Sequence, residues 1–540
     1  MPTLVIASRL LLVLLACTVA AKAEYTQAAL EDEILDLPGL NYAPKFRHFS
    51  GYVVIPGIRP NATKHVHYHF IESEQDPTKD PVVWWTNGGP GCSGLLALFT
   101  EMGPFKPNLE GVLLENAYRW NQVANMLFVE QPVGVGFSYS TDPTTDYELG
   151  DHQAAKDNYA FILAFFEKFP QYLPNDFVIS SESWGGHYIP TLAVRIVREQ
   201  SKPDVSPKLN FVGFLVGNPF TSWVNNRQAT VKALVGHSLV SYPTAAAWEE
   251  QCADFVVAPQ YLFGNCLEIE AKMNMEMADL NPYALSYPVC LDESPIASLV
   301  KHGRAQRTWL LHHTTPPEAK AKMKNELGEG VGIIDIDGYE PCEDNYLVSY
   351  LNQPAVKEAL HVDSSIVWTE CSSIIKYDLF AFFVPMEPLY KYLINGKYNL
   401  KMLVYSGDDD SVCGTWGTQK WMYGLGQKAV TNWVPWRDDA GQVAGFVTQF
   451  RGNLTMATVA GAGHEVPSYT PATALKLFRL YLDNSWFDPA AFRPWSDGGE
   501  KEVGSEQLEQ DEQQQGQDVQ QQEEREQQQE LIKASLRRHA

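Results

Sequence analysis

Three polar side chains of this sequence have the types needed for a serine nucleophile. Ser183 follows the apolar run DFVIS, Asp410 follows KMLVYS, and His464 follows TMATVA inside GAGHEVP. A serine becomes a nucleophile when a histidine takes its proton and an acid orients that histidine. Any one of these residues at the end of an apolar run is ordinary. The hypothesis therefore depends on all three occurring together.

The segments that must position these residues read as buried strands. Short apolar runs rich in β-branched and aromatic residues are typical of the central strands of a parallel sheet. Six such runs end in Gly- or Pro-containing loops: PVVWWTNGGPG, ANMLFVEQPVG, DFVISSESWGG, NFVGFLVGNP, KMLVYSGDDD and MATVAGAGHEVP. Helical patterns such as HQAAKDNYAFILAFFEKF and TALKLFRLYL lie between them. This alternation predicts an α/β fold with a mostly parallel central sheet flanked by helices.

The loops at the carboxyl ends of parallel strands are the usual place for chemistry, and the three residues fall there. The order Ser, Asp, His is that of α/β-hydrolases, although their G-x-S-x-G elbow is only partly met because Ser181 replaces the first glycine. An oxyanion hole also needs backbone N–H groups. We expect Gly89 to supply one, beside Gly88, and Trp184 to supply the other.

Two other interpretations of these loops are disfavoured. The acidic run Asp408 to Asp410 could be a solvated turn or a metal-binding loop, but no further ligand spacing accompanies it. The cysteines lack zinc-like CxxC spacing. QPVGVGFSYS lacks the third glycine and the helix of a dinucleotide fingerprint. We therefore predict no metal and no cofactor.

The two ends of the chain differ from its middle. Residues 1–23 read as a secretory signal peptide; a membrane anchor is the alternative, but the apolar run of residues 10–21 is short for a span. Residues 496–540 are Gln/Glu-rich and predict a disordered tail, with a solvated helix as the alternative. One α/β-hydrolase domain is expected over residues 24–495. The mature chain is expected to have no membrane span.

Residues 218–345 interrupt the strand and helix rhythm and hold four cysteines. We interpret about 218–345 as an inserted, disulfide-stapled lid, with a separate small domain as the alternative. The polar stretch 312–332 within it is a candidate for proteolytic excision. Asn61 and Asn453 begin glycosylation sequons. After loss of Cys17 with the signal, seven cysteines remain, which allows up to three disulfides in several connectivities and one free thiol.

The formal net charge is −24, which disfavours nucleic acid and anionic membranes as partners. The tail from residue 500 has eleven acids and five Lys or Arg, so about −18 belongs to the rest. This balance suits an acidic lumen, where carboxylates are partly protonated.

The chain resembles the serine carboxypeptidase family, acid exopeptidases of the α/β-hydrolase fold, over roughly residues 35–490. The shared blocks are WWTNGGPGCSGLLALFTEMGPF, NMLFVEQPVGVGFSYS, SESWGGHYIP, LVGNP, VYSGDDDSVCGTWGTQKW and GAGHEVP. The resemblance implies removal of C-terminal amino acids from peptides and proteins at acidic pH, through an acyl-enzyme. It implies a secretory protein of the vacuole, the lysosome or the exterior. A homodimer is left open.

The resemblance also implies roles for single residues. Ser183 is the nucleophile, His464 the general base and acid, and Asp410 the orienting acid, because the family loop reads G-D-x-D with the second Asp catalytic. The implied oxyanion donors are the backbones of Gly89 and Trp184. The implied site for the substrate's terminal carboxylate consists of Asn87, Gly88, Glu101 and Glu182. The implied disulfides are Cys92–Cys371, Cys252–Cys266 and Cys290–Cys342, with Cys413 free.

An acidic pair can bind a carboxylate if the pair shares a proton, because neighbouring like charges raise one pKa strongly. Glu101 and Glu182 would then bind substrate best at acid pH. The sequence departs from the family elbow at Ser181 and Trp184, and Trp184 is expected to re-shape the pocket beside the nucleophile. Glu465 after the histidine could favour basic leaving residues, or it could be a loop contact.

Two other functions remain open at this stage. Some family members are acyltransferases or esterases, which tend to alter the carboxylate-binding residues. A non-catalytic stabilising or binding protein on the same fold is the alternative of another class.

Overall fold

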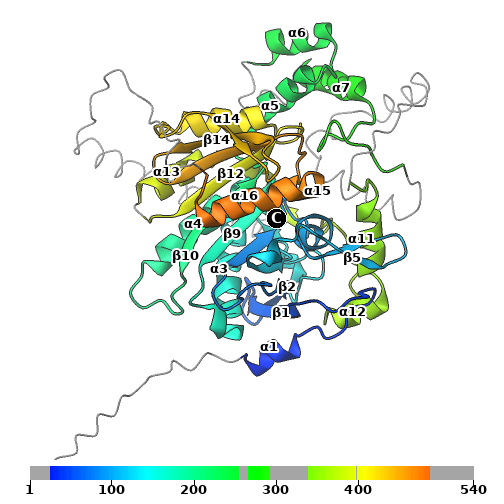
Figure 1. Ribbon diagram of the computed structural model, residues 1–540, viewed down its shortest axis with the longest axis vertical. Helices are drawn as coiled ribbons and strands as arrows, with labels where there is room; N and C mark the ends of the chain where they lie inside the picture. Colours follow the sequence, from blue (N-terminus) through cyan, green and yellow to red (C-terminus); the bar gives the residue numbers. More distant parts are fainter. Residues whose placement is uncertain (1–24, 254–264, 292–338, 397, 487–540) are drawn as a thin grey trace, which may run out of the picture.

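The computed structural model describes residues 25–253, 265–291, 339–396 and 398–486 (Figure 1). The predicted signal peptide 1–23, the tail 496–540 and the stretch 312–332 lie outside the described residues.

The described chain is built around one mixed sheet of eleven strands, in which β7 (Tyr139–Ser140) pairs only with β2. The central strands from β6 to β15 run parallel, and the outer ones run antiparallel. In spatial order the other ten are β1 (His48–Pro56), β2 (Thr63–Ile71), β6 (Asn125–Val129), β3 (Val82–Thr86), β9 (Phe177–Glu182), β10 (Phe211–Gly217), β12 (Lys401–Gly407), β15 (Leu454–Val459), β14 (Val443–Phe450) and β13 (Val434–Arg437). All six predicted strands are present.

The central strands are apolar throughout because both of their faces are covered. In β12, Met402 and Val404 belong to one core cluster, whereas Leu403 and Tyr405 belong to the other. Successive side chains of a strand point to opposite faces, so a strand between two helix layers has no polar position. This confirms the predicted α/β-hydrolase fold class.

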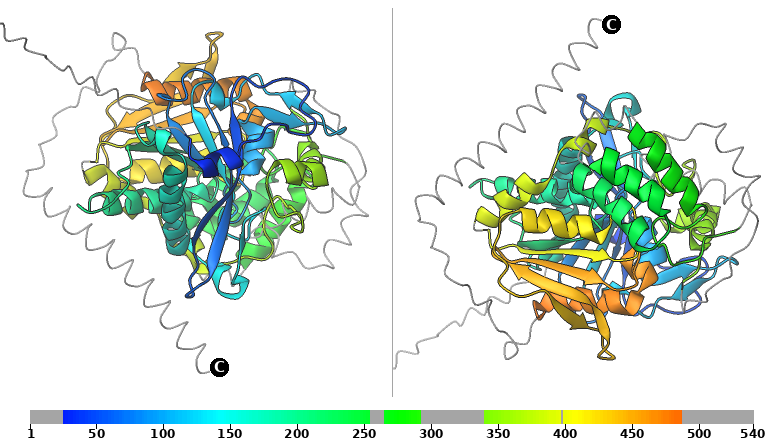
Figure 2. Two further views of the ribbon diagram at one scale, coloured as in Figure 1. Left: turned by 90° about the horizontal axis from the view of Figure 1, so that it is seen from below. Right: turned by 90° about the horizontal axis from the view of Figure 1, so that it is seen from above.

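Two layers of helices cover the sheet (Figures 1 and 2). One core cluster draws on α3 (Asp151–Lys168), α4 (Gly185–Gln200), α13 (Glu387–Asn395) and α14 (Thr415–Gly424). The other draws on η1 (Ala97–Glu101), α11 (Glu343–Leu351), α12 (Pro354–Ala359), α15 (Val466–Tyr469) and α16 (Pro471–Asp483). The remaining short elements are α1 (Gln27–Glu31), β4 (Phe105–Pro107), β5 (Leu113–Glu115), η2 (Trp120–Gln122), α2 (Pro143–Asp146), β8 (Glu148–Leu149), η3 (Pro170–Tyr172), β11 (Lys376–Tyr377) and η6 (Leu379–Phe383).

The region predicted as an insertion begins, after β10, with three helices, α5 (Trp223–Gly236), α6 (Tyr242–Gln251) and α7 (Asn265–Met277). In Figure 1 these green helices project beyond the end of the sheet. They enclose a small core of their own, which includes Trp223, Trp248 and Met273. Whether this region acts as a lid stays a prediction.

The structure contains three disulfides, Cys92–Cys371, Cys252–Cys266 and Cys290–Cys342, and Cys413 is a buried free thiol. These are the pairs that the family resemblance implies. Cys92–Cys371 closes a loop of 279 residues and ties the segment before β11 to the turn after β3.

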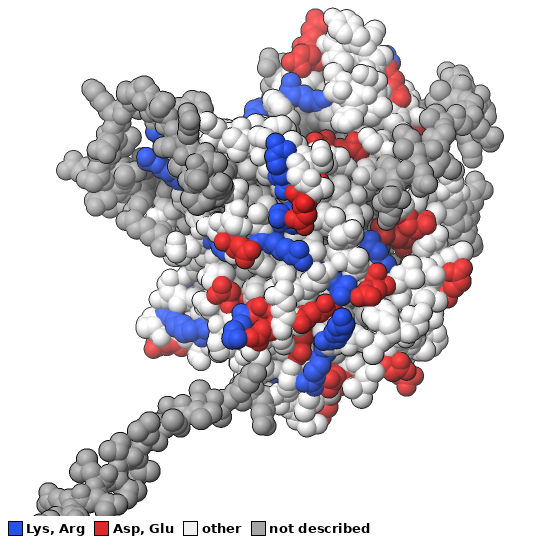
Figure 3. Space-filling view, in the orientation of Figure 1, with Lys and Arg blue, Asp and Glu red and all other residues white. Residues whose placement is uncertain are grey.

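The surface carries charges of both signs. Figure 3 shows Lys and Arg interspersed with Asp and Glu on the face in view. Within the described ranges, no helix is both long and apolar enough to cross a membrane.

Replacing Leu403 by Ala should lower the free energy of unfolding by about 2–5 kcal/mol, because the fully buried side chain leaves a cavity in the centre of the sheet. Urea denaturation measures the change. Leu35→Ala is the control, since Leu35 is 88% exposed and its loss should change stability by less than about 0.5 kcal/mol. Equal effects of the two substitutions would contradict the assignment of Leu403 to the core.

A pair of buried histidines lies on β1 and β2. His48 Nδ1 and His69 Nε2 are 3.2 Å apart, and both rings are almost fully buried. Burial lowers the pKa of His48 to about 4. Burial, together with the neighbouring histidines, lowers the pKa of His69 well below its ordinary value. Both imidazoles are therefore neutral in the folded protein.

Because an unfolded histidine has a pKa of about 6.5, the unfolded chain binds more protons than the folded one between about pH 6.5 and 4. The free energy of unfolding should fall as pH drops through this window, by up to about 3 kcal/mol from His48 alone. His48→Gln should lose less stability than the wild type between pH 7 and 4.5 in urea denaturation. If both proteins lose the same free energy of unfolding between pH 7 and 4.5, His48 does not contribute to the pH dependence of stability.

Candidate active site

Asp410 and His464 lie together at the carboxyl edge of the sheet. Asp410 follows β12 and His464 follows β15, and these strands are parallel neighbours. His464 Nδ1 lies 2.6 Å from Asp410 Oδ2, and both side chains are buried. A carboxylate at this distance fixes which ring nitrogen carries the proton and stabilises the imidazolium when it forms.

The Asp410 carboxylate also accepts hydrogen bonds from three other groups. Val412 N–H donates to Oδ1 at 2.7 Å, and Cys413 N–H donates to Oδ2 at 3.1 Å. Asn218, which follows β10, donates from Nδ2 to Oδ2 at 2.9 Å. These donors fix the orientation of the carboxylate beside His464.

Ser183 occupies a tight turn between β9 and α4. Its φ is +60°, a left-handed conformation that non-glycine residues rarely adopt. Two hydrogen bonds support it: Ser183 N–H donates to Gly217 O at 3.0 Å, and Phe220 N–H donates to Ser183 O at 2.8 Å. Strained backbone of this kind is typical of functional sites. Ser183 thus lies on an elbow-like turn between a strand and a helix, which the sequence SESWGG predicts only in part.

The sheet order places β9, β10, β12 and β15 side by side, so Ser183, Asp410 and His464 share one edge. Among the described residues, no hydrogen bond joins Ser183 to His464. Such contacts are often long without substrate and tighten only in the reacting complex.

The turn after β3 packs directly against the elbow. A Cβ on Gly88 would lie 2.4 Å from Trp184 N and 2.7 Å from Ser183 Cβ, so only glycine fits there. Gly89 has φ +111°. Within the described ranges, neither Gly89 N–H nor Trp184 N–H donates a hydrogen bond to another residue. Both therefore remain candidates for the oxyanion hole.

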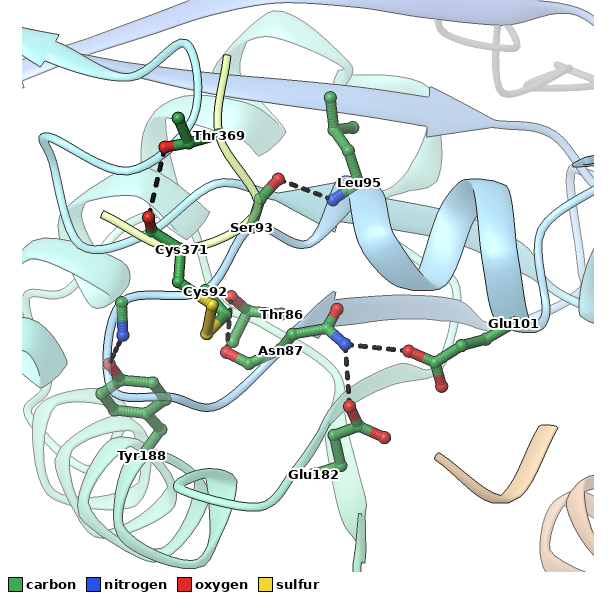
Figure 4. Close-up of a disulfide and its surroundings, with 11 residues drawn as sticks. Thr86, Asn87, Cys92, Ser93, Leu95, Glu101, Glu182, Tyr188, Thr369 and Cys371 are labelled. Carbon is green, nitrogen blue, oxygen red and sulfur yellow. Dashed lines mark hydrogen bonds between the residues drawn. A yellow bond between two sulfur atoms is a disulfide. The ribbon is translucent and has the colours of Figure 1, made fainter. Parts of the chain in front are cut away.

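The residues implied for carboxylate binding are joined through one amide. Asn87 Nδ2 donates to Glu101 Oε1 and to Glu182 Oε1, at 2.8 Å in both cases (Figure 4). Trp85 Nε1 donates to Asn87 Oδ1 at 3.0 Å, which fixes the orientation of the amide. Tyr405 lies beside the pair: its pKa is raised well above the ordinary value, first by burial and then by the charges of Glu182 and Glu101.

The two departures from the family elbow have structural roles. Ser181 donates from Oγ to Thr86 O at 2.6 Å, which links β9 to the end of β3. The Trp184 indole is only 2% exposed; it stacks on His187 with ring centres 4.1 Å apart and donates to Asp151. It therefore acts as packing behind the elbow rather than as an exposed pocket wall.

A pocket borders Asn87 and Glu101. Glu465 lines it and accepts a hydrogen bond from Tyr469 at 3.3 Å. The pocket is lined by Asn87, Leu96, Thr100, Glu101, Asn281, Tyr283, Tyr339, Glu340, Glu343, Asp344, Glu465, Ser468 and Tyr469. Its walls are acidic and aromatic, and it is the space next to the implied carboxylate-binding residues.

In the part of the chain that the structure describes, one group of side chains has metal-ligand atoms within reach of one another: Asp410, Cys413 and His464, within 4.8 Å. Burial and then the charge of Asp410 raise the pKa of the Cys413 thiol well above its ordinary value. A protonated thiol is a poor metal ligand, and the carboxylate already accepts several hydrogen bonds. The donor set fits an acid that orients a histidine better than it fits a metal site.

Asn218 is a site residue to which the sequence patterns assign no role. Its signal was present, because it follows the strand NFVGFLVG as directly as the other site residues follow theirs. The contacts of residues 282–286 with the site were also missed, and the irregular sequence of that segment carries no signal. Of the two sequons, Asn61 is exposed and Asn453 is half-buried; their glycosylation stays a prediction.

Comparison with known proteins agrees with this geometry. The model of the serine carboxypeptidase family matches residues 38–484. Serine carboxypeptidase-like 27 of Arabidopsis thaliana is 34% identical over 482 residues, which cover 88% of this chain and 97% of that protein. The lysosomal protective protein of Mus musculus is 35% identical over 467 residues, covering 84% and 94%.

Among solved structures, the chain is similar to KEX1(delta)p, a prohormone-processing carboxypeptidase from Saccharomyces cerevisiae. The TM-score is 0.61 at 20% identity, over 84% of this chain and 96% of that one, which supports the fold alone. From the family match over most of its length, the chain belongs to the serine carboxypeptidase family.

Proposed function

We propose that this protein is a serine-type carboxypeptidase that removes C-terminal amino acids from peptides and proteins at acidic pH. The observation that carries the proposal is the Asn87 amide, which donates to both Glu101 and Glu182 immediately beside the Ser183 elbow. An exopeptidase needs a site for the terminal carboxylate next to its nucleophile, and these residues have the chemistry for one. Family membership supports the same activity.

The proposed reaction proceeds through an acyl-enzyme. His464 Nε2 takes the proton of the Ser183 hydroxyl as Oγ attacks the last peptide carbonyl carbon. The N–H groups of Gly89 and Trp184 stabilise the oxyanion. His464 then protonates the leaving amino acid as the C–N bond breaks, and water hydrolyses the ester by the reverse proton path. Asp410 orients His464 throughout, through the 2.6 Å contact with Nδ1.

The acidic pair determines the pH range in this proposal. When Glu101 and Glu182 share a proton, the protonated carboxyl donates to the substrate carboxylate alongside Asn87. When both are ionised, they repel it. Acylation also needs neutral His464, so activity is limited on the acid side by the histidine and on the alkaline side by the pair.

The alternative within the family is acyl transfer to an alcohol, since several similar plant proteins are named only serine carboxypeptidase-like. The complete set Asn87, Glu101 and Glu182 favours peptide hydrolysis. We also propose a secretory location, in a lysosome-like or vacuolar compartment or outside the cell. The predicted signal peptide supports it, as does the relative named a lysosomal protective protein.

Ser183→Ala should abolish labelling by a fluorophosphonate and lower kcat for release of a C-terminal amino acid at least about 10³-fold, because the nucleophile is removed. Ser180→Ala is the matched control. Ser180 is buried on the same strand, and its Oγ has no hydrogen-bond partner among the described residues, so labelling and activity should persist. Labelling of Ser183→Ala would contradict the assignment of Ser183 as the nucleophile. Labelling of the wild type without amino-acid release from peptides would favour the acyltransferase.

The pH profile of kcat/KM should differ between a blocked dipeptide and its C-terminal amide. For the dipeptide, kcat/KM should fall up to about tenfold per pH unit above the pKa of the acidic pair, whereas the amide has no carboxylate to be repelled. Glu101→Gln should flatten this alkaline fall, because a Gln amide donates at any pH. Identical profiles for the two substrates would rule out the shared proton.

A further inference from the structure

Residues between α7 and Cys290 bond to the loops that carry Asp410 and His464. We call residues 282–286 of this stretch the brace. Pro282 and Tyr283 offer consecutive carbonyls: Pro282 O accepts from Ser411 N–H at 3.0 Å and from Ser411 Oγ at 2.7 Å, and Tyr283 O accepts from His464 N–H at 2.7 Å. One short segment thus binds the neighbour of Asp410 and the backbone of His464 itself.

The other end of the brace is attached to Asp409. Ser286 N–H donates to Asp409 Oδ2 and Ser286 Oγ donates to Oδ1, both at 2.8 Å. Leu285 N–H donates to Asp409 O at 3.1 Å. Asp409 is 4% exposed, so its carboxylate depends on these donors for compensation. His237, next to the end of α5, lies 3.4 Å from Asp409 Oδ1 and connects that helix to the same carboxylate.

The brace also contacts the His464 side chain. The rings of Tyr283 and His464 meet edge to face, with centres 5.0 Å apart and an angle of 72° between the planes. A Cβ on Gly463 would lie 2.4 Å from Tyr283 O and 2.6 Å from Ala284 Cβ, so the loop before His464 packs tightly on the brace. Tyr283 therefore restrains the imidazole and its backbone together.

We infer that the brace is a positioning element that sets His464 relative to Asp410, and that Ser286 and Asp409 are its positioning residues. Neither contacts the proposed reacting atoms; they act through Tyr283, Ser411 and the backbone of the catalytic loops. A general base works only within a narrow range of distances, and a displacement of about 1 Å can cost as much as about 10²-fold in rate. The inference rests on the proposed function, in which His464 is the base.

The chain provides a matched control for this inference. Ser241, at the start of α6, donates from N–H and Oγ to the two oxygens of Glu276, both at 2.8 Å. Ser286 bonds Asp409 in the same way, but Ser241 is the residue before α6 and makes no hydrogen bond to the loops of Asp410 and His464 among the described residues. Losing either hydroxyl removes one hydrogen bond to a carboxylate. The Glu276 side chain is more exposed than that of Asp409, so thermal unfolding measures the two stability losses separately, and the comparison concerns kcat and the labelling rate.

Ser286→Ala should lower kcat about tenfold with KM within about twofold of wild type, because His464 is displaced while Asn87, Glu101 and Glu182 are untouched. The rate of fluorophosphonate labelling at Ser183 should fall by the same factor. Ser241→Ala should change neither quantity, and Ser286→Thr, which keeps the hydroxyl, should restore most of the wild-type rate. Thermal unfolding of all variants checks that each is folded.

Unchanged kcat and labelling rate in folded Ser286→Ala would overturn the positioning role of the brace. Equal changes of kcat in Ser286→Ala and Ser241→Ala would overturn it too. Labelling needs no peptide, so it separates the two proposals. A wild type that labels but releases no amino acid would refute the peptidase while still testing the brace through the labelling rate. A wild type that neither labels nor cleaves would refute the nucleophile and the brace with it.

Discussion

The carboxylate of Asp410 is 1% exposed, and a negative charge buried to this degree is tolerated only where hydrogen-bond donors surround it. The donors come from three separate parts of the chain: its own loop, Asn218 after β10, and His464 after β15. Because these strands are fixed next to one another by the parallel sheet, one electrostatic requirement determines how three loops are arranged. The remaining features of the site are built around that arrangement.

Ser183 lies at the same edge of the sheet, but its position depends on its backbone conformation rather than on a buried charge. Its left-handed backbone costs on the order of 1–3 kcal/mol, which the surrounding structure has to offset. Hydrogen bonds to Gly217 and from Phe220 do so, and Gly88 packs against the turn without a side chain. The elbow motif is incomplete in sequence because Ser181 stands in the first glycine position, yet its hydroxyl finds a partner in Thr86 O. A glycine is therefore not required there.

Much of the fold was predictable because central parallel strands are buried on both faces. Runs such as KMLVYS are apolar at every position, and the polar residues that follow them mark the sheet edge. The loop of Asp410 could be placed beside that of His464 on that ground, whereas the choice of Asp410 among three consecutive acids rests on the family resemblance. The contact of Asn87 with Glu101 and Glu182 could not be placed in this way, because it depends on side-chain directions at the ends of β3, η1 and β9. There the family resemblance supplied what the pattern did not.

The orientation of Trp184 and the course of residues 282–286 escaped sequence reasoning for a related reason. Trp184 is predicted to re-shape the pocket beside the nucleophile, whereas hydrogen bonding to Asp151 and stacking on His187 hold its indole inside. Residues 282–286 form neither helix nor strand. Some of their backbone groups bond locally, as Ala284 N–H does to Asn281 O, but those that contact the site bond to loops distant in sequence, and no local periodicity records such contacts.

These contacts divide the insertion into parts under different physical constraints. Helices α6 and α7 pack mainly on a small core of their own, so their surface can change without affecting the loops of Asp410 and His464. Residues 282–286 have no such freedom, because their backbone groups satisfy those of Asp409, Ser411 and His464. Changes in length or direction there would leave buried polar groups unpaired, at a cost of about 1–3 kcal/mol each. Variation in α6 and α7 is thus physically separable from variation in the position of His464.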